Sequence, residues 1–335
     1  MSTNRVTHTV QPAQGRIIII TGANSGVGRA AAMRFAAAGH SVVMACRSLE
    51  RAEQVRREIV EATGNATVTV MQVDMSHQDS IASFADAFRS RYPRVDTLIH
   101  NAAYLSHGDT WRRSPDGIEI AFATNVVGPF LLTHLLLDLL RQSDDPRILH
   151  AGSNIIKHFF NPKTELDLGT LRGEPAGRKP TAVYHRYRRS KMALLMLTFI
   201  MARKLKPLGI AVNCLEINGA TMSPETLGKM TLPYRIVGRI QNLFFRPPQY
   251  TAESYVRITT EERFRGATGG NFNHKQQPMK PGSSAVASAR QQLRNVFGSQ
   301  NYPELADDVA IQEAIWDACL EATGHCKAGS GGSGV

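Results

Sequence analysis

A buried strand that runs into a glycine-rich turn, and then into a helix, is the feature that most constrains this chain. Ile17–Ile20 are four consecutive isoleucines, and Thr21-Gly-Ala-Asn-Ser-Gly-Val-Gly28 follows them directly. The helix expected over Val27–Ala38 carries small residues on several faces, which suits close packing against a sheet. This order of elements predicts the first βα unit of a parallel α/β sheet.

Strand-like and helix-like segments continue to alternate through the first two-thirds of the chain. Further strands are expected at 41–46, 66–73, 97–100, 147–152 and 210–217, and a late one near 270–274. Helices are expected at 49–62, 79–92, 125–141, 184–205 and 303–322. The alternation predicts a single Rossmann-type doubly wound parallel sheet with helices on both faces.

The predicted domain organisation is one continuous Rossmann-type unit over residues 15–324. The length of 335 residues also allows two domains, but the motifs run through one unit. Residues 223–298 are rich in Pro, Gly, Gln and Arg with weak periodicity, and we expect a substrate-side excursion there. The polar residues 1–14 and the Gly/Ser-rich tail 325–335 are expected to be flexible.

The glycine-rich turn has the spacing of a dinucleotide-binding loop. Gly22 permits the tight turn out of the strand, Gly26 lets the backbone approach a pyrophosphate, and Gly28 lets the helix pack closely. Free N–H groups at the helix N-terminus then face the phosphate oxygens. An ordinary turn is the alternative, but the flanking strand and helix favour the cofactor. The cofactor-binding residues predicted here are Gly22, Asn24, Ser25, Gly26, Val27 and Gly28.

The end of the second predicted strand distinguishes the two nicotinamide cofactors. It reads Cys46-Arg47-Ser48, with no acidic residue before Glu50. An acidic side chain here binds the 2′-hydroxyl of NAD, whereas an arginine suits the 2′-phosphate of NADP. We therefore expect NADP rather than NAD, with a surface arginine as the alternative. Asp74 is expected either to accept a hydrogen bond from the adenine amino group or to cap the following turn.

Tyr187 and Lys191 lie four residues apart, on one face of the helix expected at 184–205. A phenol near pKa 10 is a poor acid–base catalyst at neutral pH, and a nearby ammonium lowers that pKa. The pair then moves a proton to or from a carbonyl or alcohol oxygen. Both residues are also expected to bind the cofactor, with the lysine on its ribose. Tyr184 is a weaker candidate because Arg188 stands four residues on.

Two further polar residues complete the predicted catalytic set. Ser153 follows the fifth strand, where its hydroxyl polarises the substrate oxygen or else caps a turn. Asn125 opens an apolar helix, either as its N-cap or through a backbone interaction that holds a water in a proton relay to Lys191. The histidines have no ligand spacing, and no metal site is expected.

Taken together, these motifs resemble the short-chain dehydrogenase/reductase family, in its order and spacing. From about residue 15 to 222 the matching pieces are Thr21–Gly28, Asp74, Asn101-Ala-Ala103, Asn125, Ser153, Tyr187 and Lys191. The resemblance implies that Tyr187 is the general acid–base and that Lys191 lowers its pKa. It implies that Ser153 orients the substrate oxygen and that Asn125 supports the relay. It adds Asn101 and Ala102 to the cofactor-binding residues.

Within this family the chain is similar to the retinol-dehydrogenase-like and protochlorophyllide-reductase-like branch. The residues that carry this similarity are Gly22–Gly26, Ala45–Arg47, Asp116-Gly117, Ala123–Asn125, the apolar run after Phe130 and Ser190-Lys191. The branch implies NADP-dependent hydride transfer to or from a carbonyl or alcohol of a lipophilic or polycyclic substrate. The aromatic residues Phe159, Phe160, Phe244 and Phe245 support that substrate class.

Two alternatives use the same scaffold: a light-dependent or other C=C reductase, and a non-catalytic NADP-binding protein. The chain also departs from the family at two places. Asn218-Gly219 stands where Pro-Gly is usual, and Ala103 replaces a glycine. Ser153 lies far before Tyr187, so we expect the insert Asn154–Thr181 to form part of the substrate mouth.

The formal charge of +11 lies mostly in two later blocks. Leu171–Lys206 holds ten Lys/Arg against one Glu, and Lys229–Arg294 holds eleven against three. These blocks surround the expected substrate side and favour an anionic substrate, an acidic carrier or a peripheral membrane contact over specific nucleic-acid binding. The apolar stripe 192–205 is expected to form core or a homodimer face.

A cytoplasmic location is the last expectation. The four cysteines are too few and too scattered for a disulfide scaffold, which favours a reducing compartment. The N-terminal residues lack the apolar segment of a signal peptide, and no apolar run reaches the length of a membrane span.

Overall fold

The structure is a computed structural model of the 335-residue chain. It describes residues 15–105, 111–161, 163–164, 166, 168–170, 183–222, 224–228, 232–243, 245–283, 295 and 298–324. The predicted flexible ends, 1–14 and 325–335, lie outside the described residues, as does much of the predicted insert and of the excursion. The domain boundaries therefore stay a prediction.

The strands begin and end close to where the apolar and β-branched runs do. They are β1 (Ile17–Thr21), β2 (Ser41–Cys46), β3 (Val68–Gln72), β4 (Thr97–His100), β5 (Arg147–Ala151), β6 (Ala211–Leu215), β7 (Asn271–Phe272), β8 (Lys280–Gly282) and β9 (Asn301–Pro303). The first seven form one all-parallel sheet in the order β3-β2-β1-β4-β5-β6-β7. A separate parallel pair joins β8 to β9. The predicted doubly wound parallel sheet is confirmed.

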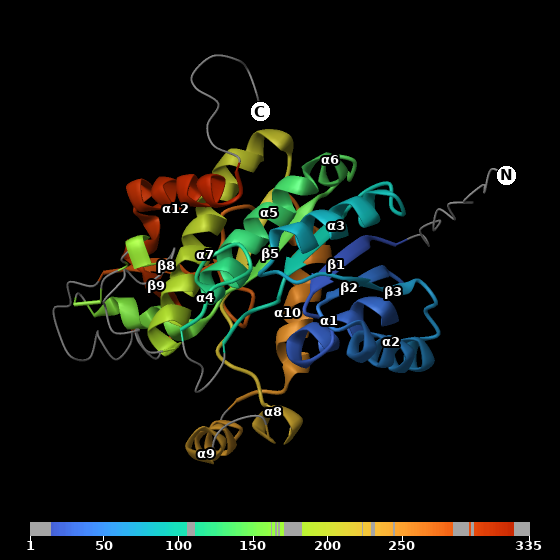
Figure 1. Cartoon of the computed structure of the whole chain (residues 1–335), viewed down its shortest axis with the longest axis horizontal. Helices are drawn as coiled ribbons and strands as arrows, with labels where there is room; N and C mark the ends of the chain where they lie inside the picture. Colours follow the sequence, from blue (N-terminus) through green and yellow to red (C-terminus); the bar gives the residue numbers. More distant parts are fainter. Residues whose placement is uncertain are drawn as a thin grey trace.

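Helices connect the strands and cover both faces of the sheet (Figure 1). They are α1 (Gly26–Ala37), α2 (Leu49–Thr63), α3 (Gln78–Arg89), α4 (Ile120–Phe122), α5 (Gly128–Leu135), α6 (Leu137–Leu140), α7 (Val183–Leu205), α8 (Pro224–Gly228), α9 (Leu232–Gln241), α10 (Pro248–Thr260) and α12 (Val309–Ala322). Among the described residues, no helix is both long and apolar enough to cross a bilayer.

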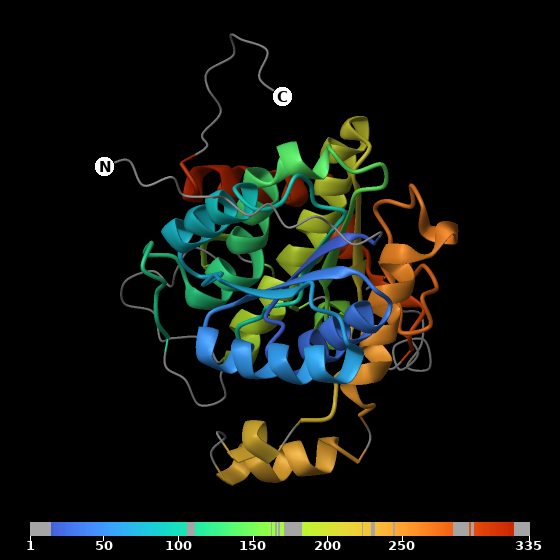
Figure 2. The same ribbon diagram turned by 90° about the vertical axis from the view of Figure 1, so that its right-hand side faces the viewer.

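The isoleucines of β1 show how the sheet divides the core. Ile17 and Ile19 belong to an apolar cluster with α3, α5, α7 and α12. Ile18 and Ile20 point to the opposite face, into a cluster with α1, α2 and α10. Successive side chains of a strand alternate between faces, so an unbroken apolar run is needed where both faces are buried. Figure 2 shows the two helical layers on either side of the sheet.

Helix α10 lies within the region predicted as a substrate-side excursion, and that prediction is wrong for this element. It packs along α1 against the sheet, with the Tyr255 side chain fully buried. The sequence of α10 is mostly polar, with arginine and glutamate on its exposed side, so its short apolar stripe gives only a weak helical periodicity. The structure thus makes this segment part of the core layer rather than part of a substrate mouth.

Asn125 does not open a helix as predicted. The helical segment begins at Ile120, and Asn125 lies in a π-helical turn, Ala123–Val127, that continues into α5. Such turns are rare inside helices and frequent at functional sites, because they displace one side chain from the regular helical face. The N-cap interpretation of Asn125 is therefore wrong.

We predict that removing the Tyr255 ring unfolds the protein more easily. Tyr255→Ala should lower the free energy of unfolding by about 3–5 kcal/mol, because a fully buried aromatic ring leaves a cavity between α1 and α10. Chemical denaturation measures this change. Gln249→Ala, on the exposed side of the same helix, is the matched control and should cost less than about 0.5 kcal/mol. Equal stability of both variants would show that α10 is dispensable for the core.

Candidate active site

The carboxyl ends of the parallel strands bring most predicted site residues to one edge of the sheet. The glycine-rich turn follows β1, Asn101 follows β4 and Ser153 follows β5. These three strands are neighbours in the sheet, together with β6. Side chains separated by more than a hundred residues therefore share one edge, which is where open α/β sheets bind ligands.

The glycine-rich turn has a backbone that only glycine adopts readily. Gly22 and Gly26 have φ values of +67° and +53°, in the left-handed region. A Cβ at Gly28 would lie 2.5 Å from both the Asn101 amide nitrogen and the Gly22 carbonyl oxygen. A Cβ at Gly26 would meet nothing within 4 Å, so this side of the turn is open. Ser25 makes no side-chain cap, which leaves the first N–H groups of α1 to a ligand.

Asn101 fixes this turn to the next strand. Its side-chain nitrogen donates to the carbonyl oxygens of Thr21 and Gly22, at 2.9 and 3.3 Å. The Thr21 hydroxyl oxygen accepts from the backbone N–H groups of Asn101 and Ala102, both at 3.0 Å. The carbonyl end of the Asn101 side chain accepts from the Tyr255 hydroxyl at 3.2 Å. Asn101 and Ala102 therefore lie at the dinucleotide turn, and Asn101 supports it.

Arg47 and Asp74 lie at the ends of β2 and β3, beyond β1 from the other predicted residues. The Arg47 side chain is exposed, and none of the ion pairs found among the described residues involves it. Asp74 caps its own turn, because its carboxylate accepts from the N–H and the hydroxyl of Ser76, at 2.9 and 2.7 Å. The capping role of Asp74 is confirmed, and its adenine contact stays a prediction.

The Ser153 side chain lies close enough to the Tyr187 hydroxyl to affect its ionisation. Burial raises the pKa of the Tyr187 phenol to about 12, and the neighbouring Ser153 hydroxyl offsets only part of that shift. Burial and Ser153 account for this shift, and the lowering expected from Lys191 stays a prediction. Ser153 also caps the following 3-10 helix, Asn154–Phe160, by accepting from the Ile155 N–H at 3.3 Å. Capping this turn leaves the Ser153 hydroxyl beside Tyr187, so the two predicted roles, turn cap and substrate contact, do not exclude each other.

Lys191 is almost fully buried, with 2% of its surface exposed. Its ammonium donates to the Ala151 carbonyl oxygen at 2.8 Å and lies 5.7 Å from the centre of the Tyr187 ring. Burial lowers the pKa of Lys191 to about 8. The titratable groups near it are neutral at pH 7, because burial raises the pKa of Cys214 to about 12 and lowers that of His150 to about 3.

Asn125 is fully buried and holds two elements of the site in place. Its side chain accepts from the Tyr104 N–H at 2.7 Å and donates to the Ser190 hydroxyl at 2.9 Å. The Ser190 hydroxyl in turn donates to the carbonyl oxygen of Tyr187. Asn125 thereby connects the loop after β4 to the helix that carries Tyr187 and Lys191.

Three residues at this edge, Ser190, Lys157 and Glu216, were not predicted from the sequence. Ser190 links Asn125 to α7, although only its place beside Lys191 marked it in the sequence. Lys157 and Glu216 form a buried ion pair of 2.8 Å at the end of β6. Burial raises the pKa of Glu216, and the lysine opposes that shift. No sequence pattern links two residues so far apart.

Two buried histidines, His100 and His150, lie on the neighbouring strands β4 and β5 with ring centres 5.1 Å apart. Each ring bonds a threonine hydroxyl, Thr133 at 2.9 Å and Thr198 at 2.8 Å. Burial lowers the pKa of both, so both are neutral at pH 7. In the part of the chain that the structure describes, no group of three His, Cys, Asp or Glu residues could hold a metal ion.

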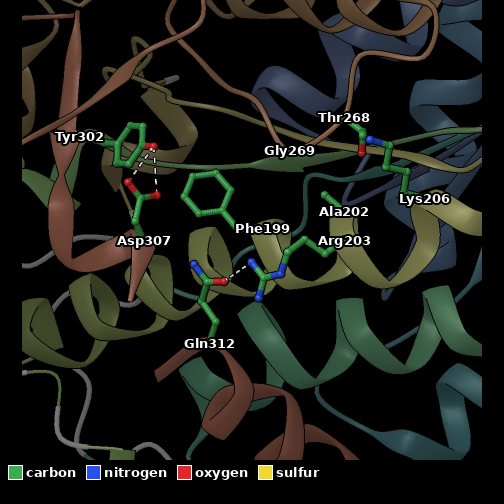
Figure 3. Close-up of a pocket in the computed structure, with 9 residues that line it drawn as sticks. All are labelled: Phe199, Ala202, Arg203, Lys206, Thr268, Gly269, Tyr302, Asp307 and Gln312. Carbon is green, nitrogen blue, oxygen red and sulfur yellow. Dashed lines mark hydrogen bonds between the residues drawn. The ribbon is translucent and has the colours of Figure 1, made fainter. Parts of the chain in front are cut away.

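A pocket of about 330 Å³ lies elsewhere on the molecule, between α7, α12 and β9 (Figure 3). Four of its polar side chains are paired, since Arg203 donates to Gln312 and Tyr302 to Asp307. Phe199 of this pocket stands twelve residues after Tyr187 on α7, which is roughly 18 Å along the helix. The pocket is therefore separate from the predicted active site.

Comparison with known proteins agrees with this geometry. The family model described as short chain dehydrogenase matches residues 16–160. Retinol dehydrogenase 11 of Homo sapiens is 31% identical over 82% of this chain and 81% of its own. Retinol dehydrogenase 14 of Homo sapiens is 30% identical, over 82% of this chain and 83% of its own.

Solved structures show the same fold. The short chain dehydrogenase from Shigella flexneri has a TM-score of 0.59 and 25% identity, over 82% of this chain and 98% of its own. A short chain dehydrogenase from Escherichia coli CFT073, complexed with NADPH, has a TM-score of 0.59 and 24% identity, over 78% and 96%. With the sheet order and the sequence relatives, these matches lead to one conclusion. The chain belongs to the retinol-dehydrogenase-like branch of the short-chain dehydrogenase/reductase family and is an oxidoreductase.

Proposed function

We propose that the protein is an NADP-dependent carbonyl reductase that interconverts a carbonyl and an alcohol on a lipophilic substrate. The observation that carries this proposal is the grouping of three side chains: Ser153 lies beside the Tyr187 hydroxyl, and Lys191 stands one helical turn along α7 with its ammonium 5.7 Å from the Tyr187 ring centre. Two hydroxyls that meet at the carboxyl edge of the sheet form a donor pair for a single substrate oxygen. That arrangement suits proton transfer coupled to hydride transfer.

In the reduction, bound NADPH supplies the hydride that adds to the carbonyl carbon. Tyr187 donates its phenolic proton to the carbonyl oxygen, which becomes the alcohol hydroxyl. Ser153 donates a hydrogen bond to the same oxygen and orients it. The Lys191 ammonium stabilises the phenolate that remains, and Asn125 holds the loop and helix that frame these groups.

Three observations support NADP as the cofactor. The open side of Gly26 and the free N–H groups at the start of α1 suit a pyrophosphate. The exposed Arg47 at the end of β2 suits a 2′-phosphate, and its neighbour Ser48 is not acidic. A solved dehydrogenase of the same fold was crystallised with NADPH. We infer that Asn24, Ser25, Val27, Tyr187 and Lys191 complete the cofactor site.

The substrate class rests on the relatives, which include several retinol dehydrogenases. The aromatic residues of the sequence analysis support it less than expected. Phe159 and Phe160 are buried, with 2% and 1% of their surface exposed. Phe245 packs close to Gly219, and Phe244 lies outside the described residues. No observation favours the C=C reductase or the non-catalytic alternative, and the cytoplasmic location and the homodimer stay predictions.

Tyr187→Phe is expected to abolish carbonyl reduction. Loss of the proton donor should lower kcat for NADPH oxidation with an aldehyde or ketone by about 100- to 10,000-fold. NADPH binding, followed by fluorescence titration, should change far less than kcat, because the other cofactor-binding residues remain, and this separates catalysis from folding. Tyr184→Phe, on the exposed start of the same helix, is the matched control and should keep its activity. Unchanged reduction by Tyr187→Phe would refute the proposed function.

Arg47→Ala is expected to weaken binding of NADPH but not of NADH. Loss of a charge-assisted hydrogen bond to the 2′-phosphate costs about 1.5–3 kcal/mol, which corresponds to a more than tenfold rise in Kd. Calorimetric titration with each cofactor measures the ratio. Arg57→Ala, which removes an exposed arginine from the middle of α2, provides the control. An equal loss for both cofactors, or none, would contradict the assignment of Arg47.

The pH profile of the reduction should report on Lys191. The ammonium is present below its pKa of about 8 and is lost as the pH rises through that value. Because the phenolate left on Tyr187 needs this charge, kcat/KM should fall above about pH 8. Lys191→Arg keeps the charge to higher pH, so the fall should move upward even if the variant is slower overall. A fall at the same pH in both proteins would assign the titration to another group.

A further inference from the structure

Helices α8 and α9 form a small unit that stands apart from the body in both views (Figures 1 and 2). The chain enters it just after β6, at the sheet edge that carries the predicted active site, and returns from it into α10. Its base is fastened at two points. The Thr221 N–H donates to the Arg246 carbonyl oxygen, and the Asn242 side chain bonds both backbone groups of Met222 at 2.8 Å.

One side of α9 is an apolar stripe exposed to solvent. The exposed fractions are 66% for Leu232, 52% for Ile236, 53% for Ile240 and 80% for Leu243. The spacing of four residues places Leu232, Ile236 and Ile240 on one face of α9, and Leu243 lies in the turn just beyond its end. The stripe holds four of the eight large hydrophobic side chains that are exposed among the described residues. We refer to these four residues as the α9 stripe.

Basic residues border the α9 stripe on one side. Between Glu225 and Glu253 the sequence contains four Lys/Arg residues and no Asp or Glu. Two of the four, Arg235 and Arg239, border the stripe on one side of the helix, by the helical periodicity of 3.6 residues. Arg239 is exposed. An apolar face with basic residues along its border is the pattern of a helix that lies in a membrane interface.

We propose that the α9 stripe docks on the surface of an anionic lipid bilayer, with α9 lying in the plane of the interface. The acyl region takes the apolar side chains, and a lipid phosphate pairs with the exposed Arg239. A second copy of this chain fits less well, because it carries the same +11 charge and the same basic border. With ten residues, α9 is about 15 Å long and lies on a bilayer without crossing it.

This placement brings the carboxyl edge of the sheet next to the lipid, because the unit joins the body immediately after β6. Lipid binding itself does not depend on the proposed reaction. Delivery of a lipophilic substrate from the bilayer to Tyr187 would rest on both proposals. Binding and catalysis can therefore be tested separately.

Vesicle flotation of the full chain tests the docking. The probes are vesicles of phosphatidylcholine alone and of an equimolar mixture of phosphatidylcholine and phosphatidylserine. The protein should float with the mixed vesicles, and much less with phosphatidylcholine alone or at high salt. Absence of binding to the mixed vesicles would overturn the proposal, whatever the enzyme assay shows.

Three variants distinguish lipid binding through the α9 stripe from non-specific binding of the protein to vesicles. The double variant Ile236→Asn/Ile240→Asn should weaken binding to the mixed vesicles by more than about tenfold, because two apolar side chains no longer enter the acyl region. Arg239→Gln should weaken it by about fivefold. Val309→Asn removes an equally exposed apolar side chain from α12, far along the chain, and should bind like the parent protein.

Other outcomes would assign the stripe to a different occupant. If the double variant binds vesicles like the parent protein, the α9 stripe is not the docking surface. If the parent is a dimer by sedimentation and the double variant a monomer, with equal vesicle binding, the stripe pairs two copies. A rise in KM for a water-soluble carbonyl without vesicles, again with equal vesicle binding, would assign the stripe to substrate. Each of these results overturns the proposal.

Discussion

The side chain of Asn101 is the interaction on which the predicted cofactor site depends most. It donates to the last carbonyl groups of β1 and its turn and accepts from Tyr255 of α10. It thereby joins the glycine-rich turn, the end of β4 and one helical layer. Its amide nitrogen is also the atom that a Cβ at Gly28 would strike. The glycine at the start of α1 and the asparagine after β4 are thus parts of one packing arrangement, although 73 positions separate their numbers. A turn held from both sides presents its N–H groups to a phosphate without having to order itself first.

How much of the fold and of the site can be predicted depends on the sequence pattern that each element produces. β1, β2 and β4 were predicted to within a residue at each end, because strands buried on both faces are unbroken apolar runs. The parallel order of the sheet then placed Ser153 and Asn101 at one edge. The contacts of Ser153 with α7 could not be predicted. About thirty residues separate Ser153 from the start of α7, and no sequence pattern in them indicates how they fold. Tyr187 could be predicted because its lysine partner, Lys191, lies four residues further on the same helix, which places both side chains on one face.

The elements that escaped prediction share a polar surface. α10 carries charged residues on its exposed side and only a short apolar stripe on the other, so its composition resembles that of a loop. α9 has the stronger apolar stripe but leaves it exposed, which no packing rule predicts. Asn125 was placed at a helix start because asparagine favours that position, whereas tertiary contacts with Tyr104 and Ser190 hold it inside a π-helical turn. For α10 and Asn125, a long-range contact outweighed the local preference.

Burial acts on Tyr187 and Lys191 in the same chemical sense, although their pKa values move in opposite directions. Burial disfavours the charged form of either group. The Tyr187 phenol therefore keeps its proton to higher pH, and the Lys191 ammonium loses its proton at lower pH. Among the described residues Lys191 has no carboxylate partner, and its nearest titratable neighbours are neutral. Its charge is therefore balanced only by the Ala151 carbonyl dipole until a phenolate forms. A proton that leaves Tyr187 converts a neutral phenol beside an unpaired cation into an ion pair, and in a buried site that pairing is worth more than in water. The same burial that opposes ionisation at rest thus favours it at the moment when a substrate oxygen takes the proton.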